Sequence, residues 1–256
     1  MLQQTQAARV APAFERFLEC FPDIRTLADA SRAEVIRAWG SLGYNRRAVA
    51  LHEAARTIVR DHGARIPSDV DVLRRLPGIG PYTAAAVAAM GHGAAVVAMD
   101  TNVRRVMARV ALGCDPTLVR PDEVVRAAVA CLDRSDPAGW NQAVMDVGRE
   151  LCRPRPRCDV CPLSEVCLFR RHGTAPAGVP PRQAPYRGSF RQIRGGVVAS
   201  LRDVPSRTLG TLARSLGTST ATAAEAVRSL ARDGLVRAGP AALAGRSSGR
   251  IRLSDG

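Results

Sequence analysis

Helical periodicity without any alternating strand pattern runs through the first two thirds of the sequence. From Met1 to about Phe169, apolar residues recur at the spacing of one helix face, and short breaks rich in Gly, Pro and Asp separate the segments. No convincing stretch there alternates apolar and polar residues, as a half-buried strand does. The chain is therefore expected to be all-α in this part, with helices joined by short turns.

A change in composition separates this helical part from the end of the chain. Residues 170–189 are rich in Pro, Gly and Arg and hold few large apolar residues, which is typical of a linker. Residues 190–256 return to helical periodicity in three segments, followed by a stretch that could form two short strands around a Gly/Ser tip. This order predicts a small winged-helix-like domain, with residues 222–232 in the position of the recognition helix. The alternative is a packing or oligomerisation module of the same shape.

The charge of the chain is strongly positive. Lys and Arg together number 37 against 23 Asp and Glu, the formal net charge is +14, and every one of the 37 cations is an arginine. Distributed cations favour phosphate backbones, so nucleic acid is the partner that we expect. The sequence has no apolar run of roughly 18 residues and no leader-like start, which predicts a cytoplasmic protein without membrane contact.

A glycine-rich turn between two helical segments is the first candidate functional element. It lies in LPGIGPYTAAAVAAM, residues 76–90, where Gly78 and Gly80 precede Pro81 at the start of an Ala-rich helix. Glycines allow backbone N–H groups to approach a phosphate closely, so we interpret the turn as a grip on a DNA backbone. A generic helical hairpin without a ligand is the alternative.

The second candidate is an aspartate in VVAMDTNVRRVMARV, residues 96–110. Asp100 follows an apolar run and precedes a helix, which is the position of an N-cap, and capping alone would account for it. The apolar approach would also place the carboxylate in a partly desolvated cleft, where a fixed negative charge stabilises a cationic sugar. Asn102 could orient a water molecule there.

Cysteine spacing points to a metal centre near residue 160. Four of the seven cysteines lie within sixteen residues and follow the spacing C-x5-C-x2-C-x5-C: Cys152, Cys158, Cys161 and Cys167. Four thiolates without histidine fit a [4Fe-4S] cluster or a zinc ion, and the single C-x2-C pair favours the cluster, because zinc ribbons usually present two. The three other cysteines stand alone in helical segments and are expected to be buried apolar residues: Cys20, Cys114 and Cys131.

Five segments, taken together and in this order, resemble one family. They are MLQQTQ at 1–6, SLGYNRRAVALHEAA at 41–55, LPGIGPYTA at 76–84, VVAMDTNVRRV at 96–106 and NQAVMDVGRELC at 141–152. The family is that of the helix-hairpin-helix base-excision DNA glycosylases with a [4Fe-4S] loop, and the likeness is greatest to the adenine glycosylases of the MutY type. It covers residues 1 to about 168 and implies a glycosylase domain over 1–169 that contains the iron–sulfur loop 152–167.

The resemblance implies roles for individual residues. Asp100 corresponds to the catalytic aspartate, and Tyr82 stands where bifunctional relatives carry a Schiff-base lysine; since the chain has no lysine, a monofunctional enzyme is implied. Gln4 and Tyr44 correspond to residues that wedge into the duplex while adenine is flipped out, although simple packing under its turn is an alternative for Tyr44. The other positions assigned to DNA contact are Gln3, Thr5, Pro77, Gly78, Gly80, Thr83 and Arg104.

The function that the resemblance implies is hydrolysis of the N-glycosidic bond of adenine paired with 8-oxoguanine or guanine. The expected partner is duplex DNA, bound by a monomer at a bacterial nucleoid. Two alternatives stay open: a DNA-binding protein without catalysis, and an endonuclease III-like glycosylase for oxidised pyrimidines. The absence of lysine counts against the second of these.

Two features depart from the family pattern. Five residues rather than six separate Cys152 from Cys158, which weakens the match of the cysteine loop. The roughly 70 residues after the linker are too few and too helical for the large α/β module that inspects 8-oxoguanine in the family. We therefore expect these residues to have another role than that module.

The start of the sequence is a third departure. MLQQTQAARV already follows helical periodicity from Leu2, with no capping residue ahead of it, so it resembles the inside of a helix. In the family the general acid is a glutamate two positions before the methionine of this segment. We expect that this glutamate and an N-terminal helix are missing, and that the true start lies upstream of Met1.

Overall fold

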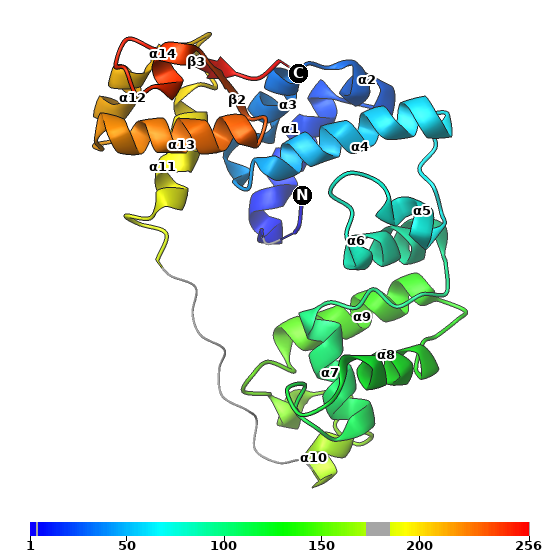
Figure 1. Cartoon of the computed structure of the whole chain (residues 1–256). Coiled ribbons are helices and arrows are strands. Elements are labelled where there is room, and N and C mark those ends of the chain that lie inside the picture. Colours follow the sequence, from blue (N-terminus) through cyan, green and yellow to red (C-terminus); the bar gives the residue numbers. More distant parts are fainter. Residues whose placement is uncertain (4, 173–184, 256) are drawn as a thin grey trace. The chain divides into compact units, whose positions relative to one another are not determined.

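The computed structural model describes residues 1–3, 5–172 and 185–255, and these residues form two compact units. The first unit is built from the described parts of Met1–Ile66 and Gln183–Gly256, and the second from those of Pro67–Arg182. Figure 1 shows the elements of both units along the chain. In sequence, the second unit is thus inserted between two halves of the first.

Helices form the N-terminal half of the first unit: α1 (Ala7–Cys20), α2 (Ile24–Asp29), α3 (Arg32–Trp39), the short 3-10 turn η1 (Gly40–Leu42) and α4 (Arg46–His62). The start of α2 is capped by Asp23, and that of α3 by a reciprocal capping box of Ser31 and Glu34. Apolar side chains of α1 to α4, including Phe17 and Trp39, pack into one core.

The prediction of a helix from the first residues is wrong, because α1 begins only at Ala7. The Arg47 guanidinium donates to the carbonyl oxygen of Met1 at 2.8 Å and to that of Gln3 at 2.5 Å. In a helix, these two oxygens would accept N–H groups four residues further along the chain. Arg47 therefore occupies the carbonyl oxygens that a first helical turn over these residues would use.

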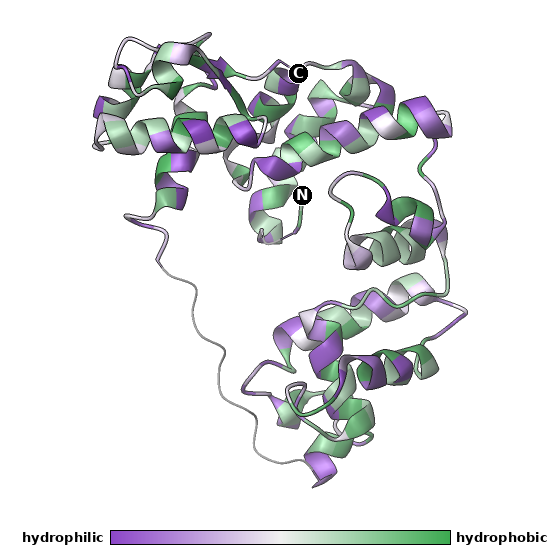
Figure 2. Cartoon of the chain, viewed as in Figure 1, coloured by the Kyte–Doolittle hydropathy of each residue, from purple (hydrophilic) through white to green (hydrophobic). Residues whose placement is uncertain are grey.

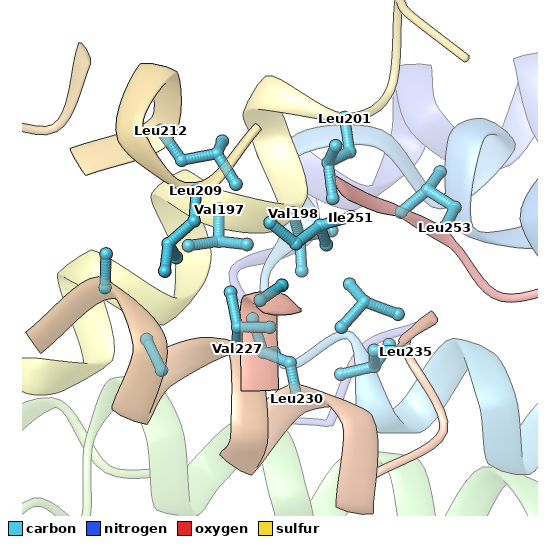
Figure 3. Close-up of a cluster of buried hydrophobic side chains, with 14 of the residues drawn as sticks. Val197, Val198, Leu201, Leu209, Leu212, Val227, Leu230, Leu235, Ile251 and Leu253 are labelled. Atoms are coloured by element: carbon cyan, nitrogen blue, oxygen red, sulfur yellow. The ribbon is translucent and has the colours of Figure 1, made fainter. Parts of the chain in front are cut away.

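The C-terminal half of the first unit is a module of helices and a small sheet: α11 (Phe190–Ser200), β1 (Arg207–Thr208), α12 (Leu209–Ser215), α13 (Thr220–Arg232), β2 (Val236–Ala238), α14 (Pro240–Leu243) and β3 (Arg250–Leu253). The strands pair antiparallel in the order β1-β3-β2, with Thr208 opposite Arg250 and Val236 opposite Leu253. Figure 3 shows the buried core of this module, to which α11, α12, α13 and β3 contribute.

Helix α3 connects the two halves of the first unit because it is buried on two sides. Val35 and Trp39 belong to the N-terminal core, whereas Ala33 and Ile36 belong to the core of the C-terminal module. The structure therefore divides the chain differently from the boundaries expected at 1–169 and 190–256. Helical spacing shows that a residue is apolar on one face, but it does not show which partner covers that face.

All regular elements in the described residues of the second unit are helices: α5 (Val70–Arg74), α6 (Pro81–Ala86), the π-helical turn η2 (Val87–Gly91), α7 (Thr101–Leu112), α8 (Pro121–Ala130), α9 (Pro137–Glu150), η3 (Cys158–Val160) and α10 (Leu168–His172). Hydrophobic and hydrophilic residues both occur in α7, α8 and α9 (Figure 2), and the apolar faces of these helices meet in a core around Val106 and Val144.

None of the helices in the described residues is long and apolar enough to span a membrane.

The expected linker, residues 170–189, divides into three parts. Residues 170–172 are the last residues of α10, and residues 173–184 lie outside the described part of the chain. Residues 185–189 lead into α11, where the Ser189 side chain caps the helix by accepting the N–H of Gln192.

Candidate active site

The turn between α5 and α6 exposes its backbone. Gly78 adopts φ +73°, a left-handed conformation that glycine reaches without strain. Gly80 is the N-cap residue of α6, and Pro81 is the first residue of that helix. Since both glycines are exposed, an anion can reach the backbone of this turn.

Asp100 caps α7, and both oxygens of its carboxylate accept hydrogen bonds. Its Oδ1 accepts the backbone N–H groups of Asn102 at 2.8 Å and Val103 at 2.7 Å, and its Oδ2 accepts the Asn102 side-chain amide at 2.8 Å. The residue is half-buried. These three donors fix the orientation of the carboxylate, so the capping role and a fixed negative charge occur together.

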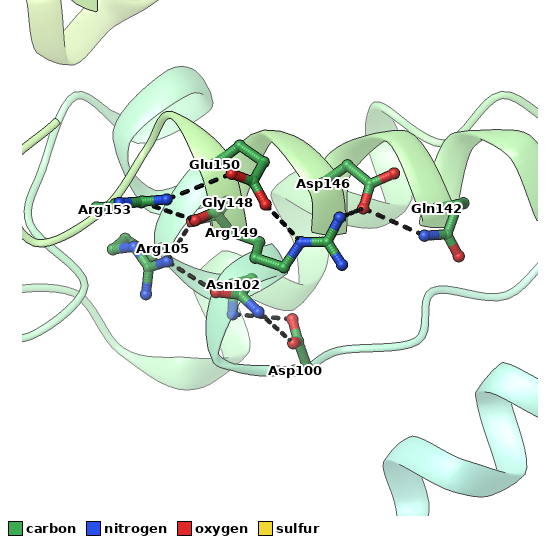
Figure 4. Close-up of polar contacts among 9 residues, drawn as sticks. All are labelled: Asp100, Asn102, Arg105, Gln142, Asp146, Gly148, Arg149, Glu150 and Arg153. Atoms are coloured by element: carbon green, nitrogen blue, oxygen red, sulfur yellow. Dashed lines mark hydrogen bonds and ion pairs between the residues drawn. The ribbon is translucent and has the colours of Figure 1, made fainter. Parts of the chain in front are cut away.

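Arg105 extends this arrangement towards the cysteine loop (Figure 4). Its Nη2 donates to the Asn102 side-chain oxygen at 2.8 Å and to the Gly148 carbonyl at 2.7 Å, and its Nε donates to the Cys152 carbonyl. Burial lowers the pKa of Arg105, while the negative charge of Asp100 acts in the opposite direction. A continuous chain of hydrogen bonds thus connects Asp100 with the backbone of Cys152.

Two residues of α9 hold this site in place, and sequence reasoning assigned neither a role. The buried Asn141 side chain accepts the N–H of Ala98 at 2.7 Å and donates to the carbonyl of Val96 at 2.9 Å, so it anchors the segment that leads to Asp100. A Cβ added to Gly148 would lie 2.6 Å from the Asn102 Cβ, which explains why glycine stands there. Both residues belong to the NQAVMDVGRELC segment, and that segment was the available signal.

Tyr82 lies within electrostatic reach of Asp100. Burial raises the pKa of the Tyr82 phenol above its usual value, and the negative charge of Asp100 raises it further. The Tyr82 hydroxyl also contacts the Met145 sulfur at 3.7 Å. Because Tyr82 is the second residue of α6, Asp100 lies near the helix that follows the glycine turn.

Comparison with known proteins identifies this arrangement. Residues 1–125 match the HhH-GPD superfamily of base excision DNA repair proteins. The adenine DNA glycosylase of Mycolicibacterium smegmatis is 44% identical over 206 residues, which cover 79% of this chain and 69% of that protein. The chain belongs to the adenine DNA glycosylase family.

Two further adenine or thymine glycosylases extend this comparison. The human adenine DNA glycosylase is 40% identical over 176 residues, which cover 67% of this chain and only 32% of the human protein. The solved structure of a thermostable thymine-DNA glycosylase gives a TM-score of 0.61 at 26% identity, over 66% of this chain and 80% of that one. The predicted family is confirmed, and so is a predominantly helical fold shared with DNA glycosylases.

The family's expected DNA-contacting residues near the N-terminus gather around Arg47, in the first unit. Besides the carbonyl of Gln3, the Arg47 guanidinium reaches the Thr5 hydroxyl at 3.4 Å. Tyr44, three residues before Arg47, has φ +48° and is 49% exposed, so its ring is open to a ligand. Gln4 lies outside the described residues.

The remaining expected DNA-contacting residues belong to the second unit. Pro77 and Thr83 flank the glycine turn and are half-buried. Arg104 is also half-buried, and its guanidinium donates to the carbonyl of Pro116 at 3.2 Å. The structure therefore ties Arg104 to the protein's own backbone, and its role in DNA contact stays a prediction.

All four cysteines of the expected metal loop line one pocket in the second unit, together with Arg109 and Phe169: Cys152, Cys158, Cys161 and Cys167. Among the described residues, no three potential ligands are arranged to hold a single metal ion. Four thiolates without histidine are a donor set that suits either a zinc ion or an iron–sulfur cluster.

The other cysteines do not behave as expected. Cys20 and Cys131 are exposed and Cys114 is half-buried, so the prediction that they are buried apolar residues is wrong. Each lies at or just beyond the C-terminal end of a helix.

Proposed function

We propose that this protein hydrolyses the N-glycosidic bond of adenine paired with 8-oxoguanine or guanine in duplex DNA, as a monomer. The observation that carries this proposal is the carboxylate of Asp100, held by three donors in a chain of the adenine DNA glycosylase family. The glycine turn at residues 78–80 offers its backbone N–H groups to a phosphate, and Gln3, Gln4, Thr5 and Tyr44 meet the base stack.

Asp100 stabilises the positive charge that develops on the sugar as adenine departs. Its orientation is set before the substrate binds, so no reorganisation is needed in the transition state. Asn102 acts by holding Asp100, because its amide nitrogen donates to Asp100 and its oxygen accepts from Arg105. The departing base also needs a proton, which a general acid supplies.

Water completes the reaction without a covalent enzyme intermediate. The chain has no lysine, and a phenol at Tyr82 cannot form a Schiff base. Free adenine and an abasic site are therefore the products, and the endonuclease III-like alternative has no amine nucleophile in a side chain.

Adenine release from duplex DNA tests this function directly. We expect free adenine from a duplex with adenine opposite 8-oxoguanine, abasic sites that break only after alkali, and no borohydride-trapped complex. Strand cleavage without alkali would favour a lyase, and retention of adenine in the duplex would contradict the proposal.

We propose further that the four cysteines of the loop hold a [4Fe-4S] cluster rather than zinc. Their shared pocket and a spacing with only one C-x2-C pair support this choice, because zinc ribbons usually present two such pairs. When bound, such a cluster fixes the loop between α9 and α10, which carries Arg153, Arg155 and Arg157, and so keeps positive charge in place for a phosphate backbone.

Metal analysis tests the cluster. We expect about four iron atoms per chain and a broad visible absorption band in protein purified without oxygen. Cys161→Ser should remove most of both, because it deletes one thiolate from the pocket. Cys131→Ser, which changes an exposed cysteine outside that pocket, should remove neither. Stoichiometric zinc without iron would contradict the proposal.

We infer that the C-terminal module is a winged helix. Helices α11, α12 and α13, a three-stranded antiparallel sheet and the order β1-β3-β2 support this assignment, with α13 in the recognition position.

A further inference from the structure

The small sheet of the C-terminal module has two unlike faces. In β3, Ile251 and Leu253 are buried in the core of the module, and side chains alternate along a strand, so Arg250 and Arg252 lie on the opposite, exposed face. Strand β2 lies beside β3 (Figure 1) and places Arg237 directly opposite Arg252. The exposed Arg237 side chain is therefore on the same face as Arg250 and Arg252, and we call these three residues the sheet arginines.

Positive charge is concentrated on this face. The three strands together carry four arginines and no aspartate or glutamate. The fourth, Arg207, is opposite the buried Ile251, is itself half-buried and donates to the carbonyl of Ser200 at 2.8 Å, so it does not belong to the exposed set. Arg252 pairs with Asp255 at 3.0 Å, but both side chains are half exposed, so water screens the pair and the face keeps a net positive charge.

The arrangement of the sheet arginines is unfavourable for the sheet itself. Side chains directly opposite each other on antiparallel strands have Cβ atoms about 5 Å apart, and like charges there destabilise the sheet. Arg237 and Arg252 are such a pair, and neither is buried in the core. Arg250 donates to the Ser206 hydroxyl at 3.3 Å, a neutral group that does not offset its charge. A bound anion would account for keeping arginine at all three positions.

Duplex DNA has the charge density that suits this face. The Cα atoms of Arg250 and Arg252 are separated by two residues of extended strand, which is about 7 Å. A duplex carries one phosphate charge per about 1.7 Å of its axis, so several phosphates lie within reach of a face of this size. Since the chain matches a superfamily of DNA repair proteins, duplex DNA is the polyanion that we expect it to meet.

Helix α13, in the recognition position, offers a weaker surface to phosphates. Its exposed side carries Glu225, which is negatively charged, and Arg228, whose guanidinium donates to the carbonyl of Leu243 at 3.0 Å. Arg232 is exposed but is the last residue of the helix. The sheet is therefore the better candidate for contact with a phosphate backbone.

We propose that the sheet arginines, Arg237, Arg250 and Arg252, bind the phosphate backbone of duplex DNA. Contacts of this kind position a protein on a duplex but carry no sequence information, so this face holds undamaged and damaged DNA alike. The inference goes beyond the proposed function, which concerns the base that is removed. It rests on that function only for the choice of duplex DNA as the partner.

The salt dependence of binding tests the proposal without requiring catalysis. The probe is an undamaged duplex, and the quantity is the slope of log K against log salt concentration between about 50 and 200 mM. Arg237→Gln/Arg250→Gln/Arg252→Gln should make this slope shallower by about 2 to 3, because each phosphate contact contributes about 0.9. Arg250→Gln alone should change the slope by about 1 and leaves the ion pair of Arg252 intact.

A triple variant of the neighbouring helices is the matched control. Arg214→Gln/Arg228→Gln/Arg232→Gln removes the same charge from exposed positions of α12 and α13 in the same module, and it should leave the slope nearly unchanged. Thermal melting shows which variants fold. The triple variant of the sheet arginines should melt no lower than the unaltered chain, since it removes a like-charge pair.

Two results would overturn the assignment of the sheet. One is an unchanged slope in the folded sheet variants, which would favour an acidic protein surface as the partner. The other is an equal change in the control, which would show that only the net charge of the module matters. Failure of the unaltered chain to bind any duplex is a different result, because it contradicts the proposed function itself.

Discussion

Asp100→Asn is expected to slow adenine release about 10³-fold. Asparagine is as good an N-cap as aspartate, so α7 should still form and its backbone N–H groups should still be bound. The variant loses the negative charge. It also loses the hydrogen bond that the Asn102 amide donates to Oδ2, because an NH2 group would replace Oδ2 and two donors would then face each other. Single-turnover kinetics on duplex with adenine opposite 8-oxoguanine measures the effect.

Asp136→Asn supplies the comparison for this experiment. Asp136 caps α9 of the same unit by accepting the N–H of Gly139 at 2.9 Å, and it takes no part in the Asp100 network. Its variant should change the rate less than about twofold, because a neutral cap preserves the helix. Equal rates for Asp100→Asn and Asp136→Asn would show that Asp100 is a cap and nothing more.

Arg109→Met is expected to destabilise the second unit by about 3–5 kcal/mol. The Arg109 side chain is only 2% exposed and pairs with Asp115, itself 6% exposed, at 3.2 Å. It also donates to the carbonyl of Arg153 at 2.6 Å and lies over the Phe169 ring, 5.1 Å from its centroid. The variant would leave a buried carboxylate without its counter-charge and would release the cysteine loop.

Hydrogen exchange measures this loss and contains its own reference. Amides of α7 should exchange faster in Arg109→Met, whereas those of α13, in the first unit, should keep their protection. Arg126→Met is the matched variant, because it breaks an exposed pair with Asp122 that contributes only a few tenths of a kcal/mol. Arg109→Met/Asp115→Leu should recover much of the loss, and no recovery would argue against the ion pair as its cause.

Local signals in the sequence were sufficient for the elements that depend on few neighbours. Gly78, Gly80 and Pro81 predict the turn and the start of α6 by their own backbone preferences, and the structure places them there. Asp100 was predicted as an N-cap because an aspartate before a helical segment has that preference wherever it occurs, and the structure shows the cap.

Contacts between residues that lie far apart in the sequence were not predicted. Asn141, Gly148 and Arg105 hold the Asp100 turn through partners 43 to 47 residues away, and no local pattern reveals such partners. The early start expected for α1 was wrong for the same reason, because Arg47, distant in sequence, binds the carbonyl oxygens that the first turn would have used. The assigned catalytic and DNA-contacting roles stay predictions.

The position of α3 between two cores sets the order in which the chain can be completed during synthesis. One face of the helix is covered by residues that are synthesised early. Ile36, on the other face, is covered only once residues 197–253 have been synthesised. The backbone N–H of Arg32 even binds the carbonyl of Asp255 at 3.2 Å. The inserted second unit can therefore assemble while the first is still half built, and a truncated product would expose an apolar surface to aggregation and proteolysis.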